Sequence, residues 1–100
     1  MTGSDNDGDA VIAMAWYKPS QWERLEEIAP DIKQTWQSYE EWHMTATRHL
    51  SKLKMSGRPA EKVEIDVEDL LIWCQERDRP VDGAARAEYA AEKLRETYGG

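Results

Sequence analysis

The sequence predicts an α+β fold dominated by helices, with two short strands and four helices in the order βααβαα. Three observations support this fold class: an unbroken apolar run near the N-terminus, a short alternating run in the middle, and four stretches in which apolar residues recur at helical spacing. A chain of 100 residues has the length of one domain, so we expect a single core. We place this globular domain at residues 10–100, behind a flexible acidic tail at residues 1–9.

The first predicted strand is the apolar run Ala10–Tyr17, AVIAMAWY. Its apolar residues are continuous and do not alternate with polar ones, and Val, Ile, Trp and Tyr are among them. This pattern favours a strand that is buried on both faces. Three alanines and a methionine in the same run leave a short helix open as the alternative.

The first predicted helix opens at Ser20 and ends before Pro30. Ser20 and Glu23 have the spacing of a capping box, in which each side chain satisfies a backbone N–H of the first turn. Proline cannot continue a helix, so Pro30 is expected to end it. The residues expected on its buried face are Trp22, Leu25, Ile28 and Ala29.

A connection over Pro30–Gln37 is predicted to lead into the longest helix, Tyr39–Met55. Ser38 and Glu41 form a second capping box at its start. Ser56-Gly57-Arg58-Pro59 is typical of a turn and ends it. Its expected buried stripe consists of Tyr39, Trp42, Ala46, His49, Leu50 and Leu53.

The second half of the chain repeats the order strand, helix, helix. Val63–Asp66 alternates apolar and polar residues, which predicts a half-buried strand. Asp66 is expected to cap a helix from Val67 to about Asp78, and Asp82 a helix over Gly83–Tyr98. The residues expected to face inward are Leu70, Leu71, Trp73 and Cys74 on the first of these helices, and Ala87, Ala91, Leu94 and Tyr98 on the second.

Two strands alone form a marginal sheet. Either the helices supply the core and the strands are a minor ribbon, or the strands complete a sheet with another chain. The sequence leaves both arrangements open.

Several short segments together form a pattern that covers most of the chain: Ala15–Tyr17, Tyr39–Trp42, Val63–Asp66, Leu70–Cys74, Asp82, Ala85–Ala87 and Tyr89–Ala90. This pattern resembles a family of small bacterial cytoplasmic proteins whose activity is uncharacterised. The resemblance implies a cytoplasmic α+β domain but brings no site residues with it.

Charge and composition exclude several classes of function. With 20 acidic and 13 basic residues the net charge is −7, which disfavours binding to nucleic acid or to an anionic membrane. No stretch is long and apolar enough to span a bilayer. A single cysteine, Cys74, cannot form an internal disulfide, which suits a reducing compartment. We therefore expect a cytoplasmic location.

Five tryptophans and no phenylalanine are the most unusual feature of the composition. Tryptophan is enriched at binding hot spots, but it also fills cores. The predicted helical stripes explain Trp22, Trp42 and Trp73 as core residues. Trp16, on the first strand, and Trp36, in the predicted connection, are the candidate partner-binding residues.

The remaining reactive side chains suggest only a weak candidate pocket between helices, formed by His43, His49 and Cys74. His43 and His49 point about 240° apart around a helix, and no metal-binding spacing is present. His49, near the predicted stripe, is expected to lie at the edge of the core. We therefore expect no metal and no cofactor, and a catalytic role is the minority interpretation.

A local basic stretch interrupts this acidic chain after residue 47. It could hold an anion or an acidic partner, although cations near a helix C-terminus also interact favourably with the helix dipole. Its residues are Arg48, Lys52, Lys54, Arg58 and Lys62.

The sequence thus favours a non-catalytic protein–protein interaction module that binds another protein or itself. The alternative is a small domain with a ligand pocket or minor enzyme activity between its helices. A third hypothesis, an acidic mimic that blocks nucleic-acid-binding proteins, rests on net charge alone.

Overall fold

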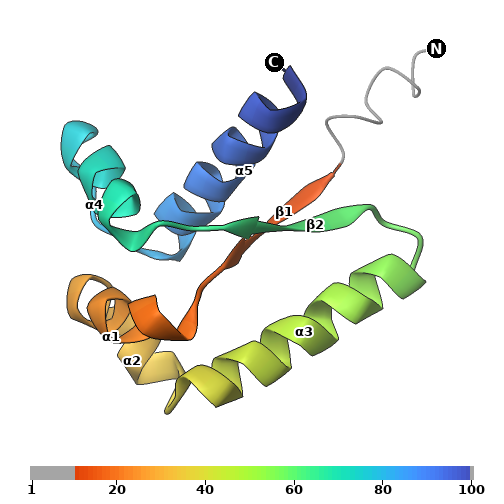
Figure 1. The fold of residues 1–100 in the computed structure, drawn as a ribbon, viewed down its shortest axis with the longest axis horizontal. Helices are drawn as coiled ribbons and strands as arrows, with labels where there is room; N and C mark the ends of the chain where they lie inside the picture. Colours follow the sequence, from red (N-terminus) through yellow and green to blue (C-terminus); the bar gives the residue numbers. More distant parts are fainter. Residues whose placement is uncertain (1–10, 100) are drawn as a thin grey trace.

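The computed structural model describes residues 11–99, and the predicted tail at residues 1–9 lies outside this range. The fold is α+β and dominated by helices, as predicted (Figure 1). Its elements are β1 (Ile12–Trp16), α1 (Pro19–Ile28), α2 (Pro30–Thr35), α3 (Tyr39–Met55), β2 (Ala60–Glu64), α4 (Val67–Glu76) and α5 (Gly83–Gly99).

The two strands are neighbours and run parallel, paired from Ile12 with Ala60 to Trp16 with Glu64. Parallel neighbours need a long crossover connection, and here α1, α2 and α3 provide it. These three helices lie on one side of the strands, and α4 and α5 lie on the other (Figure 1). Helix α5 packs mainly against β1. The sheet is therefore a thin middle layer between two helical layers.

The molecule is flat, with extents of 45 × 32 × 19 Å. Figure 1 looks down the shortest axis, and the two hydrogen-bonded strands cross in that view. The shortest dimension therefore runs along the direction in which strands pair. The sheet is only two strands wide along that dimension, so each of its edges faces one broad face of the molecule.

The core joins residues from both helical layers to the two strands. Its completely enclosed side chains include Leu25 on α1 and Leu70 on α4. The other buried core residues are Trp16, Tyr17, Trp22, Ala29, Ile32, Trp42, Ala46, Val63, Ile65, Val67, Trp73, Cys74, Val81, Ala85, Tyr89, Ala90 and Leu94.

Three of the predicted helix caps are confirmed. The Ser38 side chain accepts from the backbone N–H of Glu41 at 3.1 Å, and Glu41 in turn accepts from the N–H of Gln37 at 2.9 Å. Asp82 accepts from the N–H of Ala85 at 2.9 Å. The third cap, at the start of α4, is Asp66.

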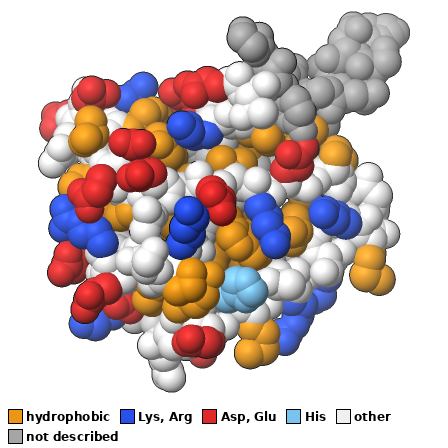
Figure 2. Space-filling model, in the orientation of Figure 1, with side chains coloured by type: hydrophobic (Ala, Val, Ile, Leu, Met, Phe, Trp, Pro, Cys, Tyr) orange, Lys and Arg blue, Asp and Glu red, His pale blue; other side chains and the backbone are white. Residues whose placement is uncertain are grey.

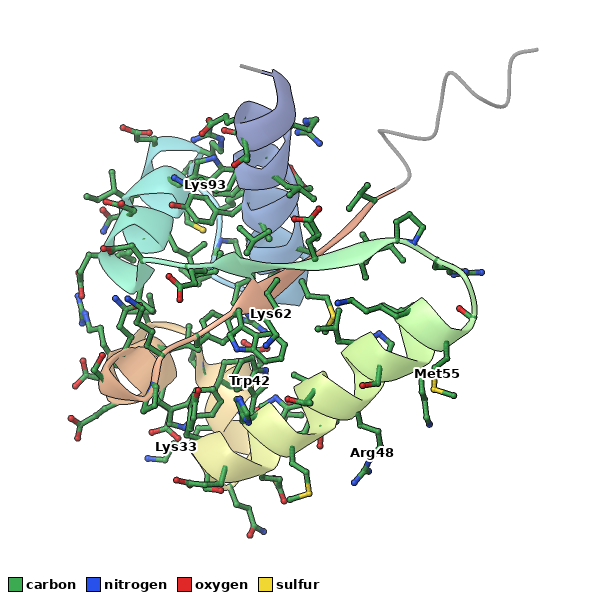
Figure 3. The ribbon with its side chains drawn as sticks, turned by 45° about the vertical axis from the view of Figure 1, so that its right-hand side comes forward. Lys33, Trp42, Arg48, Met55, Lys62 and Lys93 are labelled. Carbon is green, nitrogen blue, oxygen red and sulfur yellow. The ribbon has the colours of Figure 1, made fainter. Side chains whose placement is uncertain are left out.

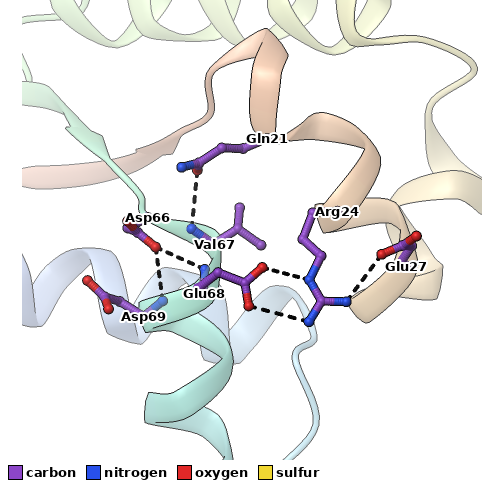
Figure 4. Close-up of polar contacts among 7 residues, drawn as sticks. All are labelled: Gln21, Arg24, Glu27, Asp66, Val67, Glu68 and Asp69. Atoms are coloured by element: carbon purple, nitrogen blue, oxygen red, sulfur yellow. Dashed lines mark hydrogen bonds and ion pairs between the residues drawn. The ribbon is translucent and has the colours of Figure 1, made fainter.

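Helix α4 is held to α1 by polar contacts around this Asp66 cap (Figure 4). The Asp66 side chain accepts hydrogen bonds from the backbone N–H of Glu68 at 3.0 Å and from that of Asp69 at 3.1 Å. Gln21 of α1 accepts from the N–H of Val67 at 3.2 Å, which satisfies another orphan donor of the same helix end. The Arg24 guanidinium also donates two hydrogen bonds to the Glu68 carboxylate, at 2.7 and 3.3 Å.

The predicted capping box at Ser20 and Glu23 is wrong. Helix α1 begins at Pro19, with Lys18 at the N-cap and no side-chain cap. Proline suits the first helical position because its missing N–H would have no partner there. Ser20 is therefore inside the helix rather than before it.

The predicted connection over Pro30–Gln37 contains a fifth helix, α2, which buries Ile32. The reason is the same preference of proline: Pro30 ends one helix and is also the first residue of the next.

The buried faces of two helices differ from prediction. His49 on α3 is exposed, so it is not at the edge of the core. On α5 the buried face contains Tyr89, and the predicted Ala87 is exposed. Tyr89 packs edge-on against Trp73 at 5.5 Å, which turns this face of α5 toward α4. The side chain of Tyr98 lies outside the described part.

The second strand begins three residues earlier than predicted and ends at Glu64. Charged Glu61 and Lys62 hide its start in the sequence pattern, and Asp66 is used as the cap of α4. The turn before it is as predicted, and Gly57 adopts a φ of +86° there, which favours glycine.

Candidate functional site

An aromatic cluster fills the space between the end of β1, α1 and α3. Trp42 is at its centre, with ring centroids 5.2 Å from Trp16, 5.1 Å from Tyr17 and 5.7 Å from Trp22 (Figure 3). Tyr39 extends the cluster along α3, 5.5 Å from Trp42. Such edge-on and tilted contacts stabilise aromatic groups beyond simple burial. The cluster is therefore a rigid part of the core.

Trp16, a candidate partner-binding residue, belongs to this cluster and is only 8% exposed. Lys62 places its ammonium 4.4 Å from the Trp16 ring centroid, a cation–π contact, and the His43 ring lies 5.6 Å away. A partner that approaches here would meet Lys62 and His43 before it met the indole.

Trp36, the other candidate, ends α2. Its backbone is extended, its N–H donates to the carbonyl of Ile32 at 2.8 Å, and its side chain is half-buried against the core. Part of this indole is packed, and the rest remains available to a partner. Its role in binding stays a prediction.

The three residues of the weak candidate pocket are not brought together. His43 and His49 are exposed on α3, whereas Cys74 is buried on α4 in the opposite helical layer (Figure 1). Burial raises the pKa of the Cys74 thiol, which disfavours the nucleophilic thiolate. Within residues 11–99 no group of three or more His, Cys, Asp and Glu side chains is placed to hold a metal ion.

A shallow depression of about 430 Å³ follows the side of α3. Met44, which is 58% exposed, forms part of it. Figure 2 shows hydrophobic side chains gathered beside a histidine, and both histidines of the chain lie on α3. Because a single helix supplies its lining, the depression is a surface feature and not an enclosed pocket. The lining residues are Tyr39, Glu40, His43, Met44, Thr47 and Arg48.

The basic stretch runs along α3, the following turn and β2. Its residues form no ion pair within residues 11–99. Lys62 instead makes the cation–π contact with Trp16. Ion pairs in the described range instead use Lys18, Arg24, Arg77, Arg79 and Arg86. The cations of α3 are exposed, as expected of a solvated helix face.

A partly buried ion pair joins α2 to α5. Arg86, 11% exposed, binds both carboxylate oxygens of Asp31 at 3.0 and 2.7 Å and also the carbonyl of Val81 at 3.1 Å. Hydrogen bonds from Arg86 lower the pKa of Asp31. Beside it, burial raises the pKa of Tyr17 to about 12. Because the Arg86 guanidinium already binds Asp31, we interpret the ion pair as a structural contact that holds α2 against α5.

The outer edge of β1 is the feature that sequence reasoning did not resolve. Ile12 donates to the carbonyl of Pro59, and Trp16 accepts from the N–H of Ile65, so these residues point their backbone groups toward β2. Because this direction alternates along a strand, Met14 also faces β2, whereas Ala13 and Ala15 face outward. No other described element hydrogen-bonds to the backbone of Ala13 or Ala15.

The side chains of β1 are also incompletely covered. All five residues from Val11 to Ala15 are apolar and partly exposed. If one face of the strand were open, buried and exposed residues would alternate. Uniform partial exposure instead shows that neither face of β1 is completely covered, although α5 packs against this strand.

The two edges of the sheet differ in charge. On β2 the outward residues include Lys62 and Glu64, and charged side chains of this kind protect an edge from pairing. On β1 the outward residues are two alanines, within the longest uncharged run of the chain, Ala10–Tyr17. That run was the available signal, but only the pairing shows which of its residues face outward.

Comparison of the chain with protein-family models, with curated proteins and with solved structures gave no match. Within the described range, no helix has both the length and the apolar character needed to cross a membrane.

Proposed function

We propose that the protein is a non-catalytic protein–protein interaction module of the cytoplasm, and that it binds by adding a partner strand to the outer edge of β1. The observation that carries the proposal is that, among residues 11–99, no element hydrogen-bonds to the outward backbone groups of Ala13 and Ala15, at the edge of an uncharged strand. Main-chain hydrogen bonds to such an edge supply affinity in β-strand addition.

The size of the sheet supports the same function. Parallel sheets are ordinarily covered on both faces and extend over several strands, but β1 and β2 form a sheet of two. One more strand would cover the exposed flank of Val11–Ala15 and pair the outward peptide groups.

The proposal can be tested with a proline that removes one outward N–H. Ala13→Pro abolishes a donor that β2 does not use, so the fold should persist while strand addition weakens by at least about tenfold. Lys62→Pro is the matched control, because it makes the same change on the free edge of β2. Proteins captured from the native host, an untagged copy of this chain included, are identified and their affinities measured for each variant.

Ala13→Lys serves as a second variant, because a charge on the strand opposes edge pairing without altering the backbone. Thermal unfolding confirms that each variant is folded. If the captured partner binds Ala13→Pro and Ala13→Lys as tightly as the unchanged chain, the outer edge of β1 is not the binding surface.

A further inference from the structure

We infer that the strand added to β1 is β1 of a second copy of this chain, paired antiparallel about a two-fold axis at Met14. This inference rests on the proposed function and names its partner. The resulting sheet would contain two strands from each copy, in the order β2–β1–β1–β2.

The register follows from the outward residues. Pairing that overlaps the whole of β1 sets Met14 opposite Met14, Ala13 opposite Ala15, and Ile12 opposite Trp16. In an antiparallel ladder, hydrogen-bonded pairs alternate with non-hydrogen-bonded ones. The outward Ala13 and Ala15 thus form the hydrogen-bonded pairs, and every free N–H and C=O of these two residues finds a partner in both copies.

Charge favours a second copy at this surface above all others on the chain. Each copy carries a net charge of −7, so a contact between charged faces would bring like charges together and add to the repulsion between two copies. Strand β1 contains no charged residue, whereas β2 and the outer helix faces contain many.

The proposed assembly is closed. After β1 pairs with its copy, the outer strands of the sheet are both β2, and their edges carry Lys62 and Glu64. Charged edges of this kind oppose further strand addition. A two-fold contact of identical surfaces also ends with two subunits and does not propagate into a fibre.

Cross-linking tests the register. In a Cys74→Ala background, Met14→Cys would place two thiols across the two-fold axis with Cα atoms about 4.5 Å apart, within disulfide reach. Ala15→Cys is the matched control: its counterpart in the other copy is displaced by about 7 Å along the strand, which puts the pair out of reach. We expect a disulfide-linked dimer from Met14→Cys and none from Ala15→Cys under mild oxidation.

Light scattering tests the association itself. The mass of the unmodified chain should rise from 11.6 kDa toward twice that value with increasing micromolar concentration, and Ala13→Pro should stay at the lower mass. A dimer that Ala13→Pro leaves intact, or equal cross-linking of the two cysteine variants, would overturn the inference.

A chain that is strictly monomeric and does not cross-link would also overturn it, but would not decide the proposed function. In that case the binding of the captured partner to Ala13→Pro decides whether a different protein adds its strand to β1: loss of binding supports the proposed function, and unchanged binding contradicts it. The two failures are therefore distinguishable.

Discussion

Trp22 contributes to the aromatic cluster at a cost. Its ring packs against Tyr17, Tyr39 and Trp42, but its indole N–H is buried and has no acceptor among the described residues. A buried donor without a partner costs about 1–3 kcal/mol. Trp73 is the contrasting case, because its N–H donates to Glu92 at 3.3 Å and Arg77 stacks 4.2 Å from its ring.

We therefore expect Trp22→Phe to destabilise the protein less than Trp73→Phe does, by about 1 kcal/mol or more. Both changes remove a similar volume, but only the second removes a satisfied hydrogen bond and a cation–π contact. Denaturant unfolding of the two variants measures the difference. An equal or larger loss for Trp22→Phe would show that its N–H is satisfied, for example by an aromatic face.

Residue roles were predictable from the sequence where they depend on near neighbours. The caps Ser38, Asp66 and Asp82 act within three positions along the chain, so their spacing was sufficient. The exposure of His49 depends on how α3 is rotated against the strands, which its own stripe does not determine. The direction in which the Ala13 backbone N–H and C=O point is likewise set by pairing with β2, so the local sequence does not predict it.

At the scale of elements, the ion pair between Arg86 and Asp31 braces α5 against α2 across 55 positions of sequence. Because Arg86 lowers the pKa of Asp31, the carboxylate stabilises the fold while it is ionised. This contribution is complete above the usual carboxyl pKa and is lost as the pH falls through the lowered folded value. Stability should therefore decline in acid, below about pH 4.

Asp31→Asn should lower the free energy of unfolding at neutral pH by on the order of 1 kcal/mol, a modest value because the Asp31 side chain is 44% exposed. The difference from the unmodified protein should shrink as the pH falls toward 2, since protonation removes the same charge. Glu27→Gln is the control, because Glu27 is exposed in a surface pair with Arg24 and should change little. A deficit that is the same at all pH values would contradict this account.

The order of elements could be predicted because β1 is a continuous apolar run, while the end of β2 and most helices carry their own periodicity. Helix α2 was missed, since six residues are too few for a clear stripe and its proline suggested a stop. The start of β2 was missed because its early residues are charged. The parallel pairing of β1 with β2 joins residues 48 positions apart, and a sequence pattern does not specify it.

At the scale of the whole molecule, the flat shape and the charge distribution point to the same surface. The sheet is only two strands wide along the 19 Å dimension, so each of its edges faces one broad face of the molecule. Within the part of the chain that the structure describes, only the β1 edge combines unpaired peptide groups with an absence of charge. A strand added there extends the middle layer and covers apolar residues that both helical layers leave partly exposed.

Residue-resolved amide hydrogen exchange at Ala13 and Ala15 tests the central claim most directly. In the dilute monomer these outward amides should exchange rapidly, while Met14, paired with β2, is protected. As the protein is concentrated, or as a captured partner is added, exchange at Ala13 and Ala15 should slow in step with complex formation. Amides that continue to exchange rapidly in a fully formed complex would place the interaction elsewhere on the molecule and contradict the account.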